Sequence, residues 1–197
     1  MFINAGLATG HANLIYSRPF NLETMSIHPD SLLEQLGISR TAIEVRGLRE
    51  YAEAISLEWV ETGDDGREFH LTPETATAWR AMKAAAGAEG IILYLGSAFR
   101  SVARQVEIIR TKLDAGLAIA DILTLCAPPG YSEHHTGRAI DIATPGSPAL
   151  EVEFETTEAF HWLGQHAQRF GFTLSYPRGN SDGYMYEPWH WCFQDKD

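Results

Sequence analysis

The chain has 197 residues, enough for one domain with a substantial hydrophobic core. Its hydrophobic content of 45% and charged content of 21% are those of an ordinary globular protein. The formal net charge of −11 argues against nucleic acid or an anionic membrane surface as a partner. Two cysteines, Cys126 and Cys192, are too few for a disulfide framework. We expect reduced thiols, with a bond between the two as the alternative.

The first residues do not have the pattern of a signal peptide. No Lys or Arg precedes Arg18, and Asn, Gly and His interrupt residues 1–14. No apolar run approaches the ~20 residues that span a bilayer. We therefore expect a cytoplasmic protein without a membrane partner.

The first half of the chain predicts three helices and a turn. Residues 29–36 predict a short helix closed by Gly37, and apolar spacing predicts a second helix around Gly47. Residues 64–66, Asp-Asp-Gly, are typical of a turn. Residues 72–73, Thr-Pro, are the cap and first residue expected of an alanine-rich helix. Its predicted buried stripe is Trp79, Met82 and Ala86.

The middle of the chain predicts a buried strand and then two helices. The apolar run 91–95 is typical of the strand, and residues 101–115 and 119–126 are typical of the helices. The predicted stripe of the first helix is Val102, Val106, Ile109 and Leu113. Residues 128–130, Pro-Pro-Gly, predict a loop that ends the second helix.

Residues 138–143 alternate as expected of a strand. Ile140 and Ile142 share one face, and Asp141 lies on the other beside alanines too small to block a metal ion. Gly137 lets the chain turn sharply between His134 and this strand.

The C-terminal part predicts a helix, two strands and a glycine-containing loop. The stripe of the helix is Phe160, Leu163, Ala167 and Phe170. The strands are expected at residues 172–176 and around Trp189, on either side of the loop 177–183. The aromatic face of the last strand is Trp189, Trp191 and Phe193. This face would pack in the core and direct His190 to the opposite side. On a regular strand, Glu187 would point away from the face of His190, because the two residues are three positions apart. We therefore expect a bend at Pro188 that brings the Glu187 carboxylate to the same side.

Together the elements predict an α+β fold, with a small, mainly antiparallel sheet that carries a zinc site and is flanked by helices.

Three side chains, His134, Asp141 and His190, match the ligand set that leaves zinc one open position for water. Glu187 would then be free to take the proton from that water. Each residue alone could be structural, but their spacing, parity and small neighbours favour one Zn²⁺ per chain. His135 is adjacent to His134 and points away from it, so we expect His134 to bind. The sequence has no H-E-x-x-H or C-x-x-C motif.

These motifs resemble those of the VanY-type D-alanyl-D-alanine carboxypeptidases, zinc peptidases related to the D-Ala-D-Ala dipeptidases and the hedgehog domain. The family pattern S-x-H-x-x-G-x-A-x-D is met by residues 132–141, and E-x-W-H is met by residues 187–190. A third pattern, S-G-Y-R-S followed by Gln, appears at residues 97–101 with Gln105, where Ala and Phe replace Gly and Tyr. The resemblance covers about residues 43–193. Residues 1–40 lie outside it and are expected to form a lid or packing segment ahead of a carboxypeptidase domain at 41–197.

The resemblance implies roles for the residues at the matching positions. Those implied to bind zinc are His134, Asp141 and His190. Glu187 would act as the general base and then as the acid toward the leaving amine. Arg100 would stabilise the oxyanion. Gln105 and Ser132 would hold the terminal carboxylate or the peptide backbone, although Gln105 could equally be a polar residue at the border of its helix.

The implied substrate is a peptidoglycan peptide. A cytoplasmic enzyme that removed D-Ala from D-Ala-D-Ala precursors would interfere with wall synthesis, whereas trimming recycled tetrapeptides would not. We therefore expect an LD-carboxypeptidase of peptidoglycan recycling. The alternatives are a DD-carboxypeptidase or dipeptidase, an L-alanyl-D-glutamate endopeptidase and a zinc-stabilised, hedgehog-like binding module. Glu187 and Arg100 argue against the binding module, since a structural site needs neither.

Overall fold

The computed structural model describes residues 29–194 as an α+β fold around a four-stranded sheet. The strand order is β3-β4-β6-β5, and every neighbouring pair is antiparallel. The strands of this sheet are β3 (Tyr94–Ser97), β4 (Ala139–Ala143), β5 (Phe172–Leu174) and β6 (His190–Phe193). A separate hairpin consists of β1 (Glu58–Thr62) and β2 (Glu68–Leu71). The predicted class, helices with a small antiparallel sheet, is confirmed.

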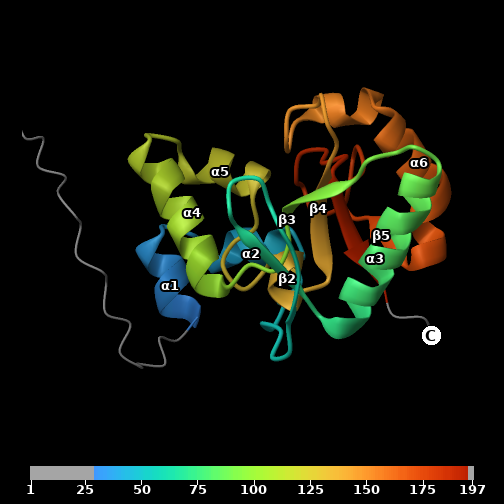
Figure 1. Cartoon of the computed structure of the whole chain (residues 1–197). Helices are drawn as coiled ribbons and strands as arrows, with labels where there is room; N and C mark the ends of the chain where they lie inside the picture. Colours follow the sequence, from blue (N-terminus) through green and yellow to red (C-terminus); the bar gives the residue numbers. More distant parts are fainter. Residues whose placement is uncertain (1–28, 195–197) are drawn as a thin grey trace, which may run out of the picture.

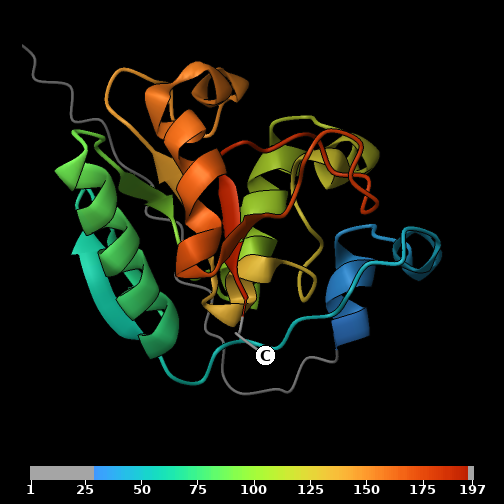
Figure 2. The same cartoon turned by 90° about the vertical axis from the view of Figure 1, so that its right-hand side faces the viewer.

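Helices lie on both sides of the four-stranded sheet. In Figures 1 and 2, α3 and α6 lie on one side, and α1, α4 and α5 gather on the other. The α-helices are α1 (Pro29–Gln35), α2 (Arg40–Val45), α3 (Pro73–Ala88), α4 (Val102–Asp114), α5 (Ile119–Leu125) and α6 (Glu158–His166). Short 3₁₀ helices are η1 (Glu133–Thr136), η2 (Val152–Thr156) and η3 (Ala167–Phe170). None of the helices within residues 29–194 is long and apolar enough to cross a membrane.

The main hydrophobic core lies between the sheet and helices α3 and α6. Trp79 of α3 is fully buried and belongs to one cluster with Ile140 and Ile142 of β4 and Trp191 of β6. Thr72 caps α3 by accepting a hydrogen bond from its first turn, as predicted. Because alternate residues of β4 and β6 face this core, the residues between them face the opposite side of the sheet.

A second apolar cluster joins α1 and α2 to α4 and α5 on the other side. Its buried members are Leu33, Leu36, Ile38, Ile43, Val106, Ile109, Ile122 and Leu123. The boundary predicted near residue 40 falls inside this cluster. Residues 1–28, most of the predicted N-terminal lid or packing segment, lie outside the described residues.

The helix predicted around Gly47 is shorter than expected. Helix α2 ends before Gly47, whose φ of 62° terminates the helix instead of continuing it. The chain after Gly47 bonds to the loop beside η1: Tyr51 N donates to Gly130 O at 2.7 Å, and Ala54 N donates to His135 O at 2.8 Å. The prediction of a helix that continues through Gly47 was therefore wrong, because the backbone amides of Tyr51 and Ala54 donate to another segment of the chain.

Two strand predictions also differ from the structure. The strand predicted at 91–95 is β3, which begins at Tyr94; Ile92 is 60% exposed. The hairpin of β1 and β2 was not predicted beyond its turn. Its strands are short and include Glu58, Glu61 and Glu68, while Val60 and Phe69 pack into the core. Glu61 of this hairpin accepts a hydrogen bond from Leu95 N at 2.8 Å. This gives a partner to a backbone N–H on the open edge of β3, the first strand of the sheet.

Candidate active site

Strand pairing brings Asp141 and His190 together. In the antiparallel ladder of β4 and β6, the two residues lie directly opposite each other. Ile140 and Trp191 occupy the core face, so Asp141 and His190 share the other face. The predicted faces of both strands are confirmed.

His134 reaches the same place from η1. Gly137 ends η1 with a φ of 66°, and the resulting turn leads directly into β4. A Cβ atom on Gly137 would lie 2.8 Å from Cδ2 of Leu57, so a side chain there would force Leu57 to shift. The prediction that Gly137 permits this turn is confirmed.

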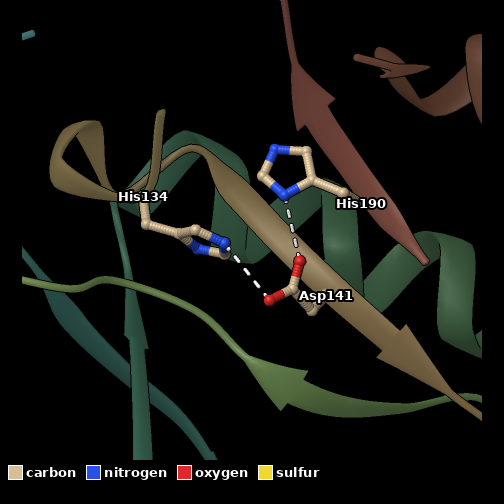
Figure 3. Close-up of side chains that lie close together, drawn as sticks. All are labelled: His134, Asp141 and His190. Atoms are coloured by element: carbon tan, nitrogen blue, oxygen red, sulfur yellow. Dashed lines mark hydrogen bonds and ion pairs between the residues drawn. The ribbon is translucent and has the colours of Figure 1, made fainter. Parts of the chain in front are cut away.

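The three candidate ligands form one buried cluster. Figure 3 shows both imidazoles directed at the carboxylate of Asp141. Nε2 of His134 lies 3.2 Å from Oδ2 of Asp141, and Nδ1 of His190 lies 3.0 Å from Oδ1. Nδ1 of His134 lies 2.8 Å from the carbonyl of Ala98. Because a carbonyl only accepts, Nδ1 carries the proton and Nε2 is the nitrogen available to a metal.

The cluster fits a single zinc ion. Two ligand atoms held at about 2.0 Å by a tetrahedral zinc ion lie about 3.3 Å apart, and the two contacts with Asp141 are close to that value. One ligand atom from each of the three residues lies within 4.8 Å of the others. Burial alone would raise the pKa of Asp141, but His134 and His190 hold it well below its usual range, so this carboxylate is ionised.

The position between Asp141 and His190 favours positive charge. Burial disfavours the charged form of the His190 ring, yet the carboxylates of Asp141 and Glu133 raise the pKa of His190 to about 10. A divalent cation at this position would meet the same negative charges.

His135 turns away from the cluster. Its Nδ1 donates to the carbonyl of Arg100 at 2.6 Å, and its Nε2 accepts from Gly130 N at 3.1 Å. Both ring nitrogens are therefore occupied by the backbone, and only one of the two adjacent histidines faces Asp141.

Glu187 reaches the site through a turn at Pro188 and Trp189, as predicted from its parity. His190 N donates to Glu187 O at 3.1 Å, and Oε2 of Glu187 lies 3.7 Å from Nδ1 of His190. Burial raises the pKa of Glu187 to about 7.

Arg100 lies beside the cluster at the end of the loop after β3. Its Nη2 is 3.9 Å from Oδ2 of Asp141 and donates to Ser97 Oγ at 3.1 Å, while Nη1 donates to Gln105 Oε1 at 3.1 Å. Gln105 is fully buried, and its Nε2 donates to Ala127 O at 2.7 Å. Both ends of the Gln105 amide thus have partners within the protein, which places Gln105 behind Arg100 instead of at the substrate-facing surface.

A cleft with a volume of about 460 Å³ opens over the site. Ser132, predicted to contact substrate, lies in its lining together with Arg100, Glu187 and the three candidate ligands. Leu125 from α5 and Met185 from the loop before β6 form part of its walls. The cleft can therefore expose a bound peptide to the predicted base and to the guanidinium at once.

Two residues at the site were not predicted. Oε2 of Glu133 lies 3.0 Å from Nε2 of His190 and accepts from Ser175 Oγ at 2.6 Å. The ring of Tyr176 lies 4.6 Å from that of His190, centroid to centroid. Glu133 is adjacent in sequence to the candidate ligand His134, and this proximity could have identified it as a residue of the site. Tyr176 ends the strand predicted at residues 172–176, but β5 ends at Leu174, and the chain after it brings Tyr176 to the site.

Comparison with known proteins gives consistent matches. The family model described as "VanY: D-alanyl-D-alanine carboxypeptidase" matches residues 68–196. A D-alanyl-D-alanine carboxypeptidase of Enterococcus faecalis is 32% identical over 119 residues, which are 55% of this chain and 42% of that protein. The bifunctional D-Ala-D-Ala dipeptidase and carboxypeptidase VanXYC of Enterococcus gallinarum is 31% identical over 132 residues, 64% of this chain and 68% of that protein. The chain matches less than half the length of the first of these relatives.

Solved structures agree with this match. The LdcB LD-carboxypeptidase is 29% identical with a TM-score of 0.58, covering 73% of this chain and 66% of that one. VanYB in complex with D-alanine-D-alanine is 26% identical with a TM-score of 0.58, covering 74% and 81%. A mutant of the D,D-pentapeptidase VanY in complex with Zn(II) is 27% identical with a TM-score of 0.55, covering 70% and 79%.

Proposed function

Because the chain belongs to the VanY family of D-alanyl-D-alanine carboxypeptidases, we propose that it is a zinc-dependent carboxypeptidase of peptidoglycan peptides. The observation that carries the proposal is the convergence of Glu187 and Arg100 on the cluster of His134, Asp141 and His190 within one cleft. A structural metal site would need neither a base nor a guanidinium beside it. This argues against the alternative of a hedgehog-like binding module.

The proposed chemistry assigns one step to each group. Zinc, one ion per chain, would lower the pKa of a bound water to about 7 and polarise the scissile carbonyl. The Glu187 carboxylate takes a proton from the attacking water and returns it to the departing amine of D-Ala. Arg100 stabilises the negative charge that develops on the carbonyl oxygen. Gln105 and Ser97 hold the guanidinium in place, because each accepts a hydrogen bond from it.

Ser132 and the cleft walls would hold the peptide so that its terminal bond meets these groups. Ser132 is almost fully buried in the cleft lining, where its hydroxyl can donate to the terminal carboxylate or to a backbone carbonyl. Gln105 supports this arrangement through Arg100. This replaces the direct substrate contact first expected of it, since its amide already has two protein partners.

For the substrate, we propose a tetrapeptide muropeptide whose terminal D-Ala is removed by LD-carboxypeptidase activity during recycling. LD-active LdcB and proteins that act on D-Ala-D-Ala are both similar to this chain, so the choice between LD and DD specificity is decided by a direct assay of both substrates. Within the same active site, the alternatives are DD-carboxypeptidase or dipeptidase activity and L-alanyl-D-glutamate endopeptidase activity.

Incubation with tetrapeptide and pentapeptide muropeptides, followed by mass spectrometry of the products, distinguishes these activities. We expect loss of one D-Ala from the tetrapeptide. Loss of D-Ala from the pentapeptide alone would replace LD with DD specificity. Release of D-Ala-D-Ala would indicate a dipeptidase, and cleavage next to D-glutamate would indicate an endopeptidase. No product from either substrate, with zinc bound, would overturn the proposed function.

A further inference from the structure

The proposed mechanism leaves one largely buried carboxylate, that of Glu133, without a role. Glu133 has no step in the proposed hydrolysis, yet its Oε2 lies 3.0 Å from Nε2 of His190. We propose that Glu133 is a positioning residue that fixes the orientation and tautomer of His190 and thereby strengthens metal binding. The inference rests on the proposed zinc site, and it assigns Glu133 to that site from this chain's own contacts.

The two nitrogens of His190 face two different carboxylates. Nδ1 lies 3.0 Å from Asp141 Oδ1, on the side of the candidate metal position, and Nε2 lies 3.0 Å from Glu133 Oε2. An ionised carboxylate only accepts hydrogen bonds, so Nε2 keeps its proton and donates a hydrogen bond to Glu133. The neutral ring then has its lone pair on Nδ1, which is the nitrogen that points toward Asp141 and the metal position.

Glu133 is itself held in place from three directions. Ser175 Oγ donates to Oε2 at 2.6 Å, and the hydroxyl of Tyr51 lies 3.5 Å from Oε1. The carbonyl of Glu133 accepts from Thr136 Oγ1 at 2.6 Å, which fixes the backbone within η1. A carboxylate with this many partners occupies one position, so it can impose an orientation on His190.

Glu133 also links the two segments that carry the histidines. It precedes His134 in η1, and its side chain reaches across to His190 in β6. The side chain of His190 is only 3% exposed and that of Glu133 14%, so water competes little for their hydrogen bond. The bond therefore keeps η1 and β6 at the separation at which both imidazoles face Asp141.

In each of the two histidines, the ring nitrogen that points away from the metal position has a hydrogen-bond acceptor, and the two acceptors differ in charge. His134 donates to the neutral carbonyl of Ala98, whereas His190 donates to the ionised carboxylate of Glu133. Removal of the Glu133 charge therefore acts on one ligand and leaves the other in place. Glu133 lines a second cleft of about 460 Å³ with Tyr51 and Arg138, away from the substrate side, so a smaller side chain leaves a space open to solvent instead of a sealed cavity.

The test compares zinc affinity among variants, by competition with a chromophoric chelator. Glu133→Ala should weaken zinc binding about 10- to 100-fold. Glu133→Gln, which keeps an acceptor oxygen without the charge, should lose less, and Ser175→Ala should also lose less than Glu133→Ala. The matched control is Glu107→Gln on the exposed face of α4, whose carboxylate pairs with Arg104 on the surface, and this variant should keep the wild-type affinity.

Thermal unfolding with and without zinc identifies a merely structural role. If Glu133 only stabilises the fold, Glu133→Ala will lower Tm equally in both conditions and leave zinc affinity within about twofold of wild type. That result would overturn the inference while leaving the proposed hydrolysis untouched. A wild-type chain that binds no zinc would overturn the proposed function, and this inference with it.

Discussion

Three carboxylates surround the imidazole of His190. Asp141 and Glu133 each lie 3.0 Å from one of its nitrogens, and Glu187 lies 3.7 Å from Nδ1. With both imidazoles neutral, as metal ligation requires, the nearest positive group is Arg100, 3.9 Å from Asp141. These three carboxylates, one buried and two largely buried, then leave excess negative charge beside one guanidinium when all are ionised. A divalent cation would balance that excess, and this is the physical basis for a metal at the site.

Glu187→Gln is expected to remove most turnover while zinc stays bound. The amide keeps the size of the side chain but cannot accept a proton from water, so kcat should fall by at least about a hundredfold. Muropeptide turnover and elemental zinc analysis on the same sample measure both effects. Glu107→Gln serves again as the control and should keep full activity. Near-normal turnover by Glu187→Gln would exclude it as the base.

Arg100→Lys is expected to lower kcat more than it raises KM. Lysine keeps the charge but cannot donate to Gln105 and Ser97 with the fixed geometry of a guanidinium. The loss of an oxyanion donor costs about a hundredfold or more in kcat. Steady-state kinetics separate the two constants. If KM alone rises, Arg100 binds substrate without stabilising the transition state.

At the scale of elements, the segment from η1 through β4 carries most of the site. It holds Glu133, His134 and Asp141, and the turn at Gly137 sets the angle between its two halves. β4 is buried along its whole length and pairs with β3 on one side and β6 on the other. A carboxylate on a central strand cannot move far, so the position of Asp141 is set by the sheet.

Gly137→Ala is expected to destabilise the protein more than Gly116→Ala. Both glycines have positive φ, 66° and 89°, where a side chain costs about 1–2 kcal/mol. A Cβ at position 116 meets nothing within 4 Å, whereas a Cβ at 137 meets Leu57 at 2.8 Å. Urea denaturation of both variants measures the difference in the free energy of unfolding. Equal losses would show that the Leu57 contact relaxes without cost.

At the scale of the whole molecule, the cleft lies between two separately packed halves. The sheet with α3 and α6 forms one cluster, and α1, α2, α4 and α5 form the other (Figure 1). Arg46 connects the second half to the loop before β6, because Nε donates to Asp182 O and Nη1 donates to Leu123 O, each at 2.8 Å. The candidate metal cluster belongs to the first half, and part of the wall over it belongs to the second.

Removal of zinc by a chelator is expected to lower Tm and abolish hydrolysis, and added zinc should restore both. Ligand binding to the folded state stabilises it by about 4 kcal/mol when free zinc is a thousand times its Kd. Thermal unfolding with chelator and with added zinc measures the shift. Asp141→Asn, which removes a candidate ligand charge, should show a much smaller shift. A Tm independent of zinc in the unmodified chain would contradict the metal site.

Periodicity and local chemistry made part of this architecture predictable. Thr72 as a helix cap, the αL turn at Gly137 and the inward faces of β4 and β6 depend on neighbouring residues, so they can be predicted from the local sequence. The same patterns identified the candidate ligand set, because residue type limits which side chains can bind zinc.

The packing of separate elements sets which distant groups meet. The register that places Asp141 opposite His190, the bond from Arg100 to Gln105 and the contact of Glu133 with His190 all join separate segments. Such contacts arise from the packing of whole elements, and no local pattern encodes them. The β1–β2 hairpin was missed for the same reason, since its short, charged strands are held by packing against α3 and β3.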